Sequence, residues 1–294
     1  MSDGKGKIMA DYKIFTDSAC DFTIDAISER GLVCLPLTFR FEGEEKEYKN
    51  YDMSITEFYD KMKAGGVAKT AAINTESFAE GFRGALEGGY DVLYIGFSTG
   101  LSTTYNSARL ASLELAEEYP ERKIVCVDTL AASAGVALLV DMVLEKKAEG
   151  ATIDEAAAYA EELKLKIAHW FTVDDLVYLK RGGRVSPTVA FVGNLLGIKP
   201  VLHVDNEGHL TNVSKSRGRH ASILALAERL GKTAEAGSKV YISHGSCIDD
   251  AKKLASVIEE KYGFKVQLIT DVGPVIGAHS GPGTLALFFV ASER

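Results

Sequence analysis

The amino-acid sequence predicts an α/β protein with two domains, the first a three-layer α/β/α parallel sheet and the second an α/β domain with a mixed sheet. Three observations support this prediction. The chain has 294 residues, 46% of them hydrophobic and 25% charged, which suits two globular domains. Short apolar runs alternate with helical periods in the first half, and adjacent β-rich runs occur in the second. We place the domains at residues 9–168 and 169–294, preceded by a disordered extension of residues 1–8.

The first half alternates strands and helices. Strands are predicted at residues 12–15, 32–36, 92–97 and 124–127, and helices at residues 55–63, 78–86, 105–119 and 132–147. Thr152 and Glu155 have the spacing of a capping box, which predicts a further helix at residues 152–167. This alternation is typical of a parallel sheet covered on both faces, whose ligands bind beyond the carboxyl ends of the strands.

The second half begins with a predicted hairpin. Its β-rich runs 198–204 and 210–215 are joined by a short turn-like insert, residues 205–209. Helices are then predicted at residues 220–230 and 249–262, and strands at residues 239–244, 264–269 and 284–290. Adjacent antiparallel strands do not fit a purely parallel sheet, so we expect a mixed sheet with helices mostly on one face.

Composition argues against several classes of function. The net charge of -8, without a basic stripe, argues against a nucleic-acid partner. The six histidines have no paired-ligand spacing, so no metal site is predicted. The most apolar helical stretch, residues 131–144, is too short to span a bilayer and contains Asp141, which predicts no membrane insertion. The four cysteines form no CxxC pair, and we expect a reduced, cytoplasmic protein.

Six serine and threonine hydroxyls crowd residues 98–108, where an apolar strand should give way to a helix. The N–H groups at a helix N-terminus attract anions, and hydroxyls can donate to them. No Lys, His, Asp or Glu lies in this stretch, so it resembles a holder of a carboxylate or phosphate more than a catalyst. Ser98, Ser102 and Thr104 are candidates. An ordinary N-cap with spare hydroxyls is the alternative interpretation.

Two other polar stretches of the first half could reach the same sheet edge. Asp17 and Asp21 follow the first strand and suit either acid and base chemistry or the capping of backbone N–H groups. We favour capping for Asp21 and leave Asp17 open. Thr70 precedes a helix capped by Asn74 or Thr75, and its hydroxyl could reach the same anion or serve only in a turn.

The second half offers a histidine and three arginines. Four glycines and two prolines surround His279 in residues 273–283, which predicts a loop with a fixed backbone that presents this histidine. Arg184 follows two glycines and could clamp a carboxylate or phosphate, with Arg217 and Arg219 adding positive charge. Solvated surface arginines are the alternative. The glycines beside Arg184 follow no dinucleotide-binding pattern, and no cofactor is predicted.

Together these stretches resemble the DegV family, whose members bind fatty acids and include the fatty-acid-binding subunits of bacterial fatty acid kinase. The resemblance runs from about residue 9 to the C-terminus. It depends on Thr16-Asp17-Ser18 after the first strand, the hydroxyl-rich residues 98–108, the Gly-Gly-Arg within residues 179–186, and His279 with Gly281-Pro282-Gly283. The combination in this order and spacing is specific, although no single piece is.

The resemblance implies a site for the ligand. It implies that Thr70 and Ser102 bind a fatty acid carboxylate with His279 nearby, and that Arg184 with Arg217 or Arg219 acts where the carrier meets its kinase. Thr103 stands where glycine is usual in the family. The apolar residues 189–196 and 285–290 are candidates for the wall of an acyl tunnel, with plain core as the alternative.

We therefore expect a carrier that is not itself an enzyme. It would bury one long-chain fatty acid and present the carboxylate to a separate fatty acid kinase catalytic subunit. The absence of a GxxxxGK[ST] loop supports this expectation. The alternative is a small-molecule phosphotransferase or hydrolase that uses Asp17, His279 and Arg184 in one cleft. A binding module for another apolar carboxylate is a third possibility.

Overall fold

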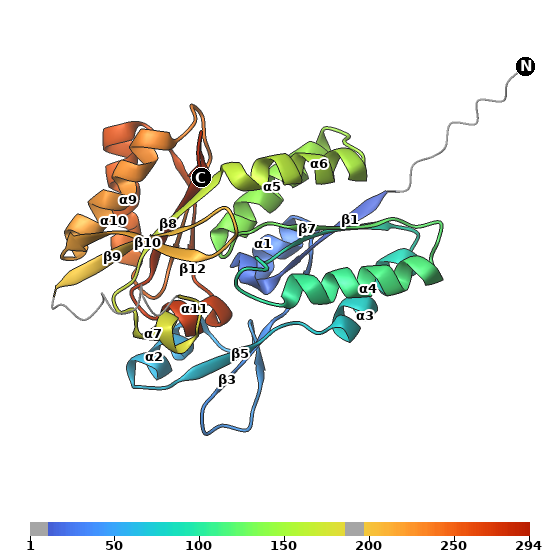
Figure 1. The fold of residues 1–294 in the computed structure, drawn as a ribbon, viewed down its shortest axis with the longest axis horizontal. Helices are drawn as coiled ribbons and strands as arrows, with labels where there is room; N and C mark the ends of the chain where they lie inside the picture. The colour runs from blue at the N-terminus through green and yellow to red at the C-terminus, as the bar shows by residue number, and fades with distance from the viewer. Residues whose placement is uncertain (1–10, 186–196) are drawn as a thin grey trace, which may run out of the picture.

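The computed structural model describes residues 11–185 and 197–294, and its strands form three sheets (Figure 1). Sheet A has the order β2-β1-β6-β7, with β1 Tyr12–Asp17, β2 Val33–Leu35, β6 Asp91–Gly96 and β7 Ile124–Asp128. Sheet B has the order β4-β3-β5, with β3 Thr38–Phe41, β4 Tyr48–Lys49 and β5 Ala68–Ala71. Sheet C has the order β10-β9-β8-β13-β11-β12, with β8 Ile167–Thr172, β9 Ile198–Val204, β10 Leu210–Arg217, β11 Val240–His244, β12 Val266–Asp271 and β13 Leu285–Val290.

Helices cover these sheets. Those of the first half are α1 Ile24–Glu29, α2 Ile55–Lys63, α3 Thr75–Glu87, α4 Thr104–Glu118, α5 Ala134–Ala148 and α6 Ile153–Leu163. Those of the second half are α7 Val177–Arg181, α9 Arg219–Thr233, α10 Ile248–Tyr262 and α11 Pro274–Ser280. Two short 3-10 helices, η1 Ser18–Cys20 and η2 Lys164–Lys166, precede Asp21 and β8. The predicted extension of residues 1–8 lies outside the described residues.

Sheet A confirms the predicted parallel, three-layer arrangement. Its three strand pairs are all parallel. Helices α3 and α4 pack on one face, where Phe78 and Phe82 meet Phe15 and Tyr94. Helices α5 and α6 pack on the other face. The predicted cap Asn74 and the predicted Thr152–Glu155 capping box are both present. The helix after Thr152 ends at Leu163 and not at residue 167, because β8 begins there.

The N-terminal half of helix α5 is buried on all sides because it lies between sheets A and C. Every residue from Ala134 to Val140 is buried, whereas the C-terminal half of the helix carries exposed side chains such as Glu145. The buried residues share one core with Ile14 and Leu93 of sheet A and with Phe171 and Phe288 of sheet C. A helix that is apolar around its whole circumference needs cover on every face, which explains the hydrophobic stretch in the sequence. Among the described residues, no helix has both the length and the apolar character that crossing a bilayer requires.

Sheet C is mixed, as predicted. The hairpin of β9 and β10 is antiparallel, β11 and β12 are parallel, and β13 pairs antiparallel with both β8 and β11. Its first strand begins at Ile167, close to the predicted domain boundary. Helices α9 and α10 pack on the outer face through residues such as Leu226 and Leu254, and α5 approaches the inner face. The inner face carries Phe171, Ala286 and Phe288 toward the first domain.

Sheet B was not predicted from the sequence. Its strands are two to four residues long, too short for a periodicity to stand out. Phe39 and Phe41 of β3 pack against Phe58 of α2 in a small aromatic core. The pairing of β3 with β5 places Thr70 opposite Phe39. Sheet B therefore fixes the position of one candidate site residue.

The run of residues 273–283 contains a helix, so the prediction of a continuous loop was wrong. Helix α11 spans Pro274–Ser280, with Pro274 in its first turn and Gly281 at its C-terminal end. Proline lacks the N–H that a first helical turn leaves unused, and Gly281, with φ of 81°, adopts a backbone conformation that favours glycine. These residues mark the ends of a seven-residue helix. His279 is thus presented from a helix and not from a loop.

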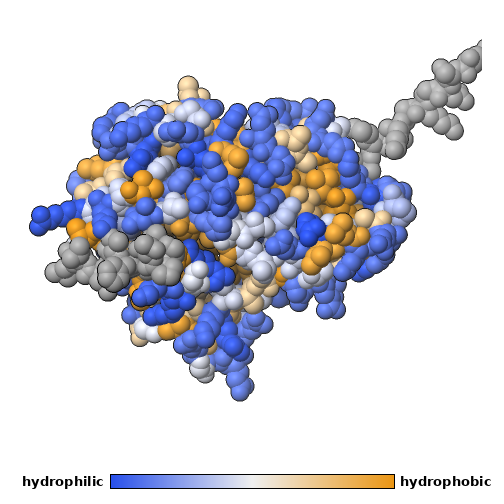
Figure 2. Space-filling view, viewed as in Figure 1, coloured by the Kyte–Doolittle hydropathy of each residue, from blue (hydrophilic) through white to orange (hydrophobic). Residues whose placement is uncertain are grey.

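Hydrophilic side chains cover most of the face seen in Figure 2, and hydrophobic ones form smaller patches between them. This surface agrees with the net charge of -8. All four cysteines carry free thiols, and Cys20 is fully buried. The apolar residues of the sequence are therefore concentrated in the layers between sheets and helices.

The shared core around α5 predicts the effect of a cavity mutation. Leu138→Ala should lower the free energy of unfolding by about 2–5 kcal/mol, because Leu138 is fully buried. Since α5 contacts both sheets, urea transitions followed by Trp170 fluorescence and by far-UV circular dichroism should shift together. The control Leu113→Ala removes a side chain that is 55% exposed on α4 and should change stability by less than about 0.5 kcal/mol. Separate transitions by the two probes would contradict a shared core.

Candidate functional site

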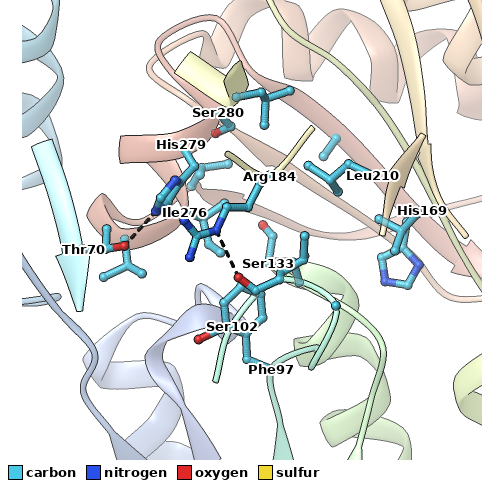
Figure 3. A pocket seen from close by; sticks show the side chains of 18 of the residues that line it. Thr70, Phe97, Ser102, Ser133, His169, Arg184, Leu210, Ile276, His279 and Ser280 are labelled. Carbon is cyan, nitrogen blue, oxygen red and sulfur yellow. Dashed lines mark hydrogen bonds between the residues drawn. The ribbon is translucent and has the colours of Figure 1, made fainter. Parts of the chain in front are cut away.

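A cavity of about 510 Å³ lies where sheet A, sheet B and the inner face of sheet C meet. The segment after β6 forms one wall through Phe97 and residues 99–103, and strands β8, β11 and β13 with helix α11 form the opposite wall. This location at the carboxyl end of a parallel strand agrees with the prediction. Most lining side chains are apolar, including Phe97, Phe171, Val275 and Phe288. Figure 3 shows Thr70 and His279 at one end of the view and His169 at the other.

Thr70 and His279 meet across the cavity end. The hydroxyl of Thr70 on β5 lies 2.7 Å from Nε2 of His279 on α11 (Figure 3). Nδ1 of His279 is buried and has no hydrogen-bond partner within the described part of the chain. A Cβ atom at Gly182 would stand 2.1 Å from Nδ1, so the close approach of α7 to this ring requires glycine.

The imidazole of His279 is neutral at physiological pH. Burial lowers its pKa to about 4, and the positive charge of Arg184 acts in the same direction. A neutral imidazole carries one N–H donor and one acceptor nitrogen. His279 therefore offers the cavity a hydrogen bond and little charge.

Ser102 faces the same cavity from the segment before α4. Its hydroxyl oxygen lies 2.9 Å from that of Thr104 and accepts the N–H of Thr104 at 3.2 Å. Thr104 is fully buried behind it, whereas Ser102 is half-buried and lines the cavity. Thr104 thus holds Ser102 in place at the N-terminus of α4, with Ser102 at the cavity wall.

Arg184 supplies positive charge at the solvent side of the cavity. Its Nε donates to the carbonyl of Leu101 at 3.1 Å, and a terminal nitrogen donates to the carbonyl of Gly182 at 2.5 Å. Figure 3 places its guanidinium between His279 and Ser102. The residue is exposed, while Thr70, Ser102 and His279 are half-buried. One end of the cavity therefore combines neutral donors with one cation, close to solvent.

Asp17 lies outside the cavity, contrary to the alternative that placed it in one cleft with His279 and Arg184. It is fully buried, and its carboxylate accepts the hydroxyl of Tyr94 and the N–H groups of Ala19 and Phe97. Burial raises its pKa, and these hydrogen bonds oppose the rise. Asp17 caps η1 and anchors the start of residues 97–103, which is the capping role left open by the sequence.

Ser98 and two of the arginines are also placed away from the lining. Ser98 is fully buried and donates to the carbonyl of Gly208, which ties residues 97–103 to the β9–β10 turn. Arg219 is half-buried, with Nε 2.8 Å from Asp250. Arg217 is exposed at the end of β10. Of the two tunnel-wall candidates, residues 189–196 lie outside the described residues, and β13 contributes Ala286 and Phe288 to the wall.

A buried polar cluster at the inner end of the cavity was missed by the sequence reasoning. Asp21 accepts the hydroxyl of Ser133 and, through its other oxygen, the N–H of Gly273. Ser133 and Ser243 line the cavity with their hydroxyl oxygens 2.8 Å apart. Burial raises the pKa of Asp21 to about 7, although both hydrogen bonds oppose the rise. These residues lie more than a hundred positions apart, and no local motif connects them.

Comparison with known proteins identifies the family. The model of the DegV family, described as uncharacterised, matches residues 11–292. The chain belongs to the DegV family. A DegV domain-containing protein of Clostridium perfringens is 41% identical over 290 residues, covering 97% of this chain and 99% of the relative. A fatty acid-binding protein of Thermotoga maritima is 33% identical over 290 residues, covering 96% of this chain and 98% of the relative.

Solved structures share the DegV fold over nearly the whole chain. The crystal structure of a fatty acid (stearic acid)-binding protein from Eubacterium ventriosum has a TM-score of 0.87 and 26% identity, covering 95% of this chain and 98% of that one. The fatty acid kinase B3 protein of Streptococcus pneumoniae, loaded with linoleic acid, has a TM-score of 0.84 and 23% identity, covering 95% and 99%. This second likeness is one of fold. The predicted family and two-domain α/β fold are confirmed.

Asp21 makes stability depend on pH. Its pKa of about 7 lies above the value of about 3.9 for an unfolded aspartate, so its contribution is complete below about pH 4 and is lost as pH rises through about 7. The free energy of unfolding of the wild type, minus that of Asp21→Asn, should therefore fall across this range by up to a few kcal/mol. Urea denaturation at a series of pH values measures this difference. A difference that stays flat or rises with pH would exclude the raised pKa.

Proposed function

We propose that this DegV protein binds one long-chain fatty acid, holds its carboxylate with Thr70, Ser102 and His279, and buries the acyl chain. The observation that carries the proposal is that the cavity changes from polar at its solvent side to apolar in its interior. Its solvent side has neutral donors and the cation Arg184, and its interior is lined by side chains such as Phe171 and Phe288. Fatty acid binding by the relatives from Thermotoga maritima and Eubacterium ventriosum supports it.

The energetics favour a long apolar ligand with a single charged end. Burying about fifteen methylenes contributes about 12 kcal/mol before the costs of ordering the chain and desolvating its head group. Arg184 compensates the charge of a carboxylate, and hydroxyls that donate to it strengthen the contact. Since the pKa of His279 lies near 4, its contribution at neutral pH is a hydrogen bond.

The carboxylate end faces solvent, which suits a carrier that presents its ligand to a second protein. A separate kinase subunit would phosphorylate the carboxylate while the tail stays buried. Asp17 lies outside the cavity, so the three residues of the alternative phosphotransferase or hydrolase do not come together. Arg217 is exposed and suits contact with a kinase, whereas Arg219 is held by Asp250 and Asp174.

The carboxylate site is tested by comparing an acid with its ester. The delipidated wild-type chain should bind stearic acid one to one in native mass spectrometry titrations. Ser102→Ala and Thr70→Val should each weaken stearic acid by about tenfold or more, because a hydrogen bond to a charged group is lost. Methyl stearate should bind these variants and the wild type nearly alike, since it lacks the negative charge.

Ser77→Ala removes an exposed hydroxyl on α3 outside the cavity and provides the control, with no change for either ligand. A wild-type chain that stays free of stearic acid would overturn the proposed function. Equal weakening of acid and ester in Ser102→Ala would remove Ser102 from the carboxylate site while leaving the carrier function.

The presentation step is tested at Arg217. Arg217→Ala should bind stearic acid as the wild type does but lower acyl phosphate formation when a fatty acid kinase catalytic subunit and ATP are added. Arg219→Ala should instead lower the free energy of unfolding, because Asp250 loses its partner. Unchanged phosphoryl transfer with Arg217→Ala would show that this face is not the contact. Phosphoryl transfer by the chain alone with ATP would contradict the carrier function.

A further inference from the structure

Two hydroxyls interrupt the apolar interior of the cavity. Ser133, at the start of α5, and Ser243, on β11, lie with their oxygens 2.8 Å apart (Figure 3 labels Ser133). Both residues are buried, with 5% and 0% of their surface exposed. Val272 and Ala286 line the same cavity. Register places Ser243 directly opposite Ala286, a small residue that leaves the hydroxyl room.

Ser133 stands at the N-cap of α5, but its hydroxyl does not cap the helix. Serine at an N-cap normally accepts an N–H of its own helix, but Ser133 makes no such bond. The first turn is closed by the backbone instead, with the N–H of Gly135 on Ala132 and that of Val136 on Ser133. Ser133 also has φ of 57°, a conformation that costs a non-glycine residue free energy and is found at functional sites.

The hydrogen-bond chain behind the two serines has a direction. An ionised Asp21 can only accept hydrogen bonds, so the hydroxyl of Ser133 donates its hydrogen bond to Asp21. The hydroxyl oxygen of Ser133 then accepts a hydrogen bond from Ser243, so the hydroxyl of Ser243 has no further hydrogen to donate. The lone pairs of Ser243 that remain form an acceptor in the cavity wall. A ligand group that matches it must carry a proton to donate.

This acceptor lies away from the carboxylate end. The second oxygen of Asp21 accepts the N–H of Gly273, which caps the N-terminus of α11, whereas His279 lies near the C-terminus of that helix. Six residues at 1.5 Å each separate them by roughly 9 Å. Val275 and Ile276, from the turn between, also line the cavity. A fatty acid held at His279 would pass Ser243 several carbons along its chain.

We propose that Ser133 and Ser243 form a subsite for a hydroxyl group within the acyl chain, so that the ligands of this protein include mid-chain hydroxy fatty acids. The inference rests on the proposed function, because it requires the carboxylate to be held at His279. A hydroxyl buried against plain hydrocarbon without a partner would weaken binding by tenfold or more. A hydroxyl donating to Ser243 avoids this loss. A keto group at the same carbon cannot donate.

The test uses the delipidated full-length chain and a series of octadecanoic acids with one hydroxyl at successive positions, titrated against displacement of a fluorescent fatty acid. At about pH 8, where Asp21 is ionised, the wild type should bind one mid-chain hydroxy acid at least as tightly as stearic acid. It should bind the matched keto acid about tenfold more weakly. Ser243→Ala should weaken that hydroxy acid about tenfold and leave stearic acid within twofold.

Ser280→Ala is the matched control, because Ser280 also lines the cavity with a buried hydroxyl but lies at the other end of α11. It should leave the ratio of hydroxy acid to stearic acid affinity unchanged. Tight stearic acid binding with every hydroxy acid weakened tenfold, or with no effect of Ser243→Ala on the ratio, would overturn the subsite and leave the proposed function standing. Failure of stearic acid itself to bind would overturn both.

Discussion

The burial of the N-terminal half of α5 on all sides is the constraint that arranges the rest of the molecule. A helical segment whose residues Ala134 to Val140 are all buried must be covered by two layers, and sheets A and C provide them. The two sheets thereby share a core. Their edges then converge at the N-terminus of α5, where Ser133 lines the same cavity as residues 99–103, α11 and the inner face of sheet C. The cavity is the space that this convergence leaves.

The charge states of the residues around the cavity depend on how deeply each residue is buried. Near solvent Arg184 is exposed, and the half-buried His279 is neutral because burial lowers its pKa to about 4. Deeper inside, Asp21 stands behind two hydroxyls and has a pKa of about 7. A ligand with a negative head and a neutral tail matches this gradient. A ligand charged at its inner end would face an acidic group in a medium that stabilises charge poorly.

Much of the fold was predictable because its signals are local. The parallel strands of sheet A, the hairpin of sheet C and the long helices each carry their own periodicity. The elements that failed depend on other signals. Strand β5 is fixed by pairing with β3, a distant segment, and α11 is marked by Pro274 and Gly281, which suggest a loop when glycine and proline are counted together.

The residues of the candidate site likewise include some that a local sequence signal marks and others that it does not. The hydroxyl-rich segment, Thr70 and His279 stand out by residue type, and the cavity brings Thr70, Ser102 and His279 to one end. Which hydroxyls line the cavity could not be predicted from the sequence, since Ser98 and Thr104 lie in the same hydroxyl-rich run as Ser102 but are buried outside the cavity. The cluster around Asp21 had no local signal, because each partner comes from a different element.

A bound acyl chain would lie between two layers that already share a core, and this links occupancy to stability. The cavity wall includes Phe171 and Phe288 of sheet C and Phe97 of the first domain, so an apolar tail would contact both. A ligand that binds only the folded chain raises the free energy of unfolding by about 2.7 kcal/mol at a hundred times its dissociation constant. The tail would thus act as an extension of the core that α5 begins. Release of the acid would remove packing from both domains at once, so the apo chain should unfold at a lower denaturant concentration than the loaded one.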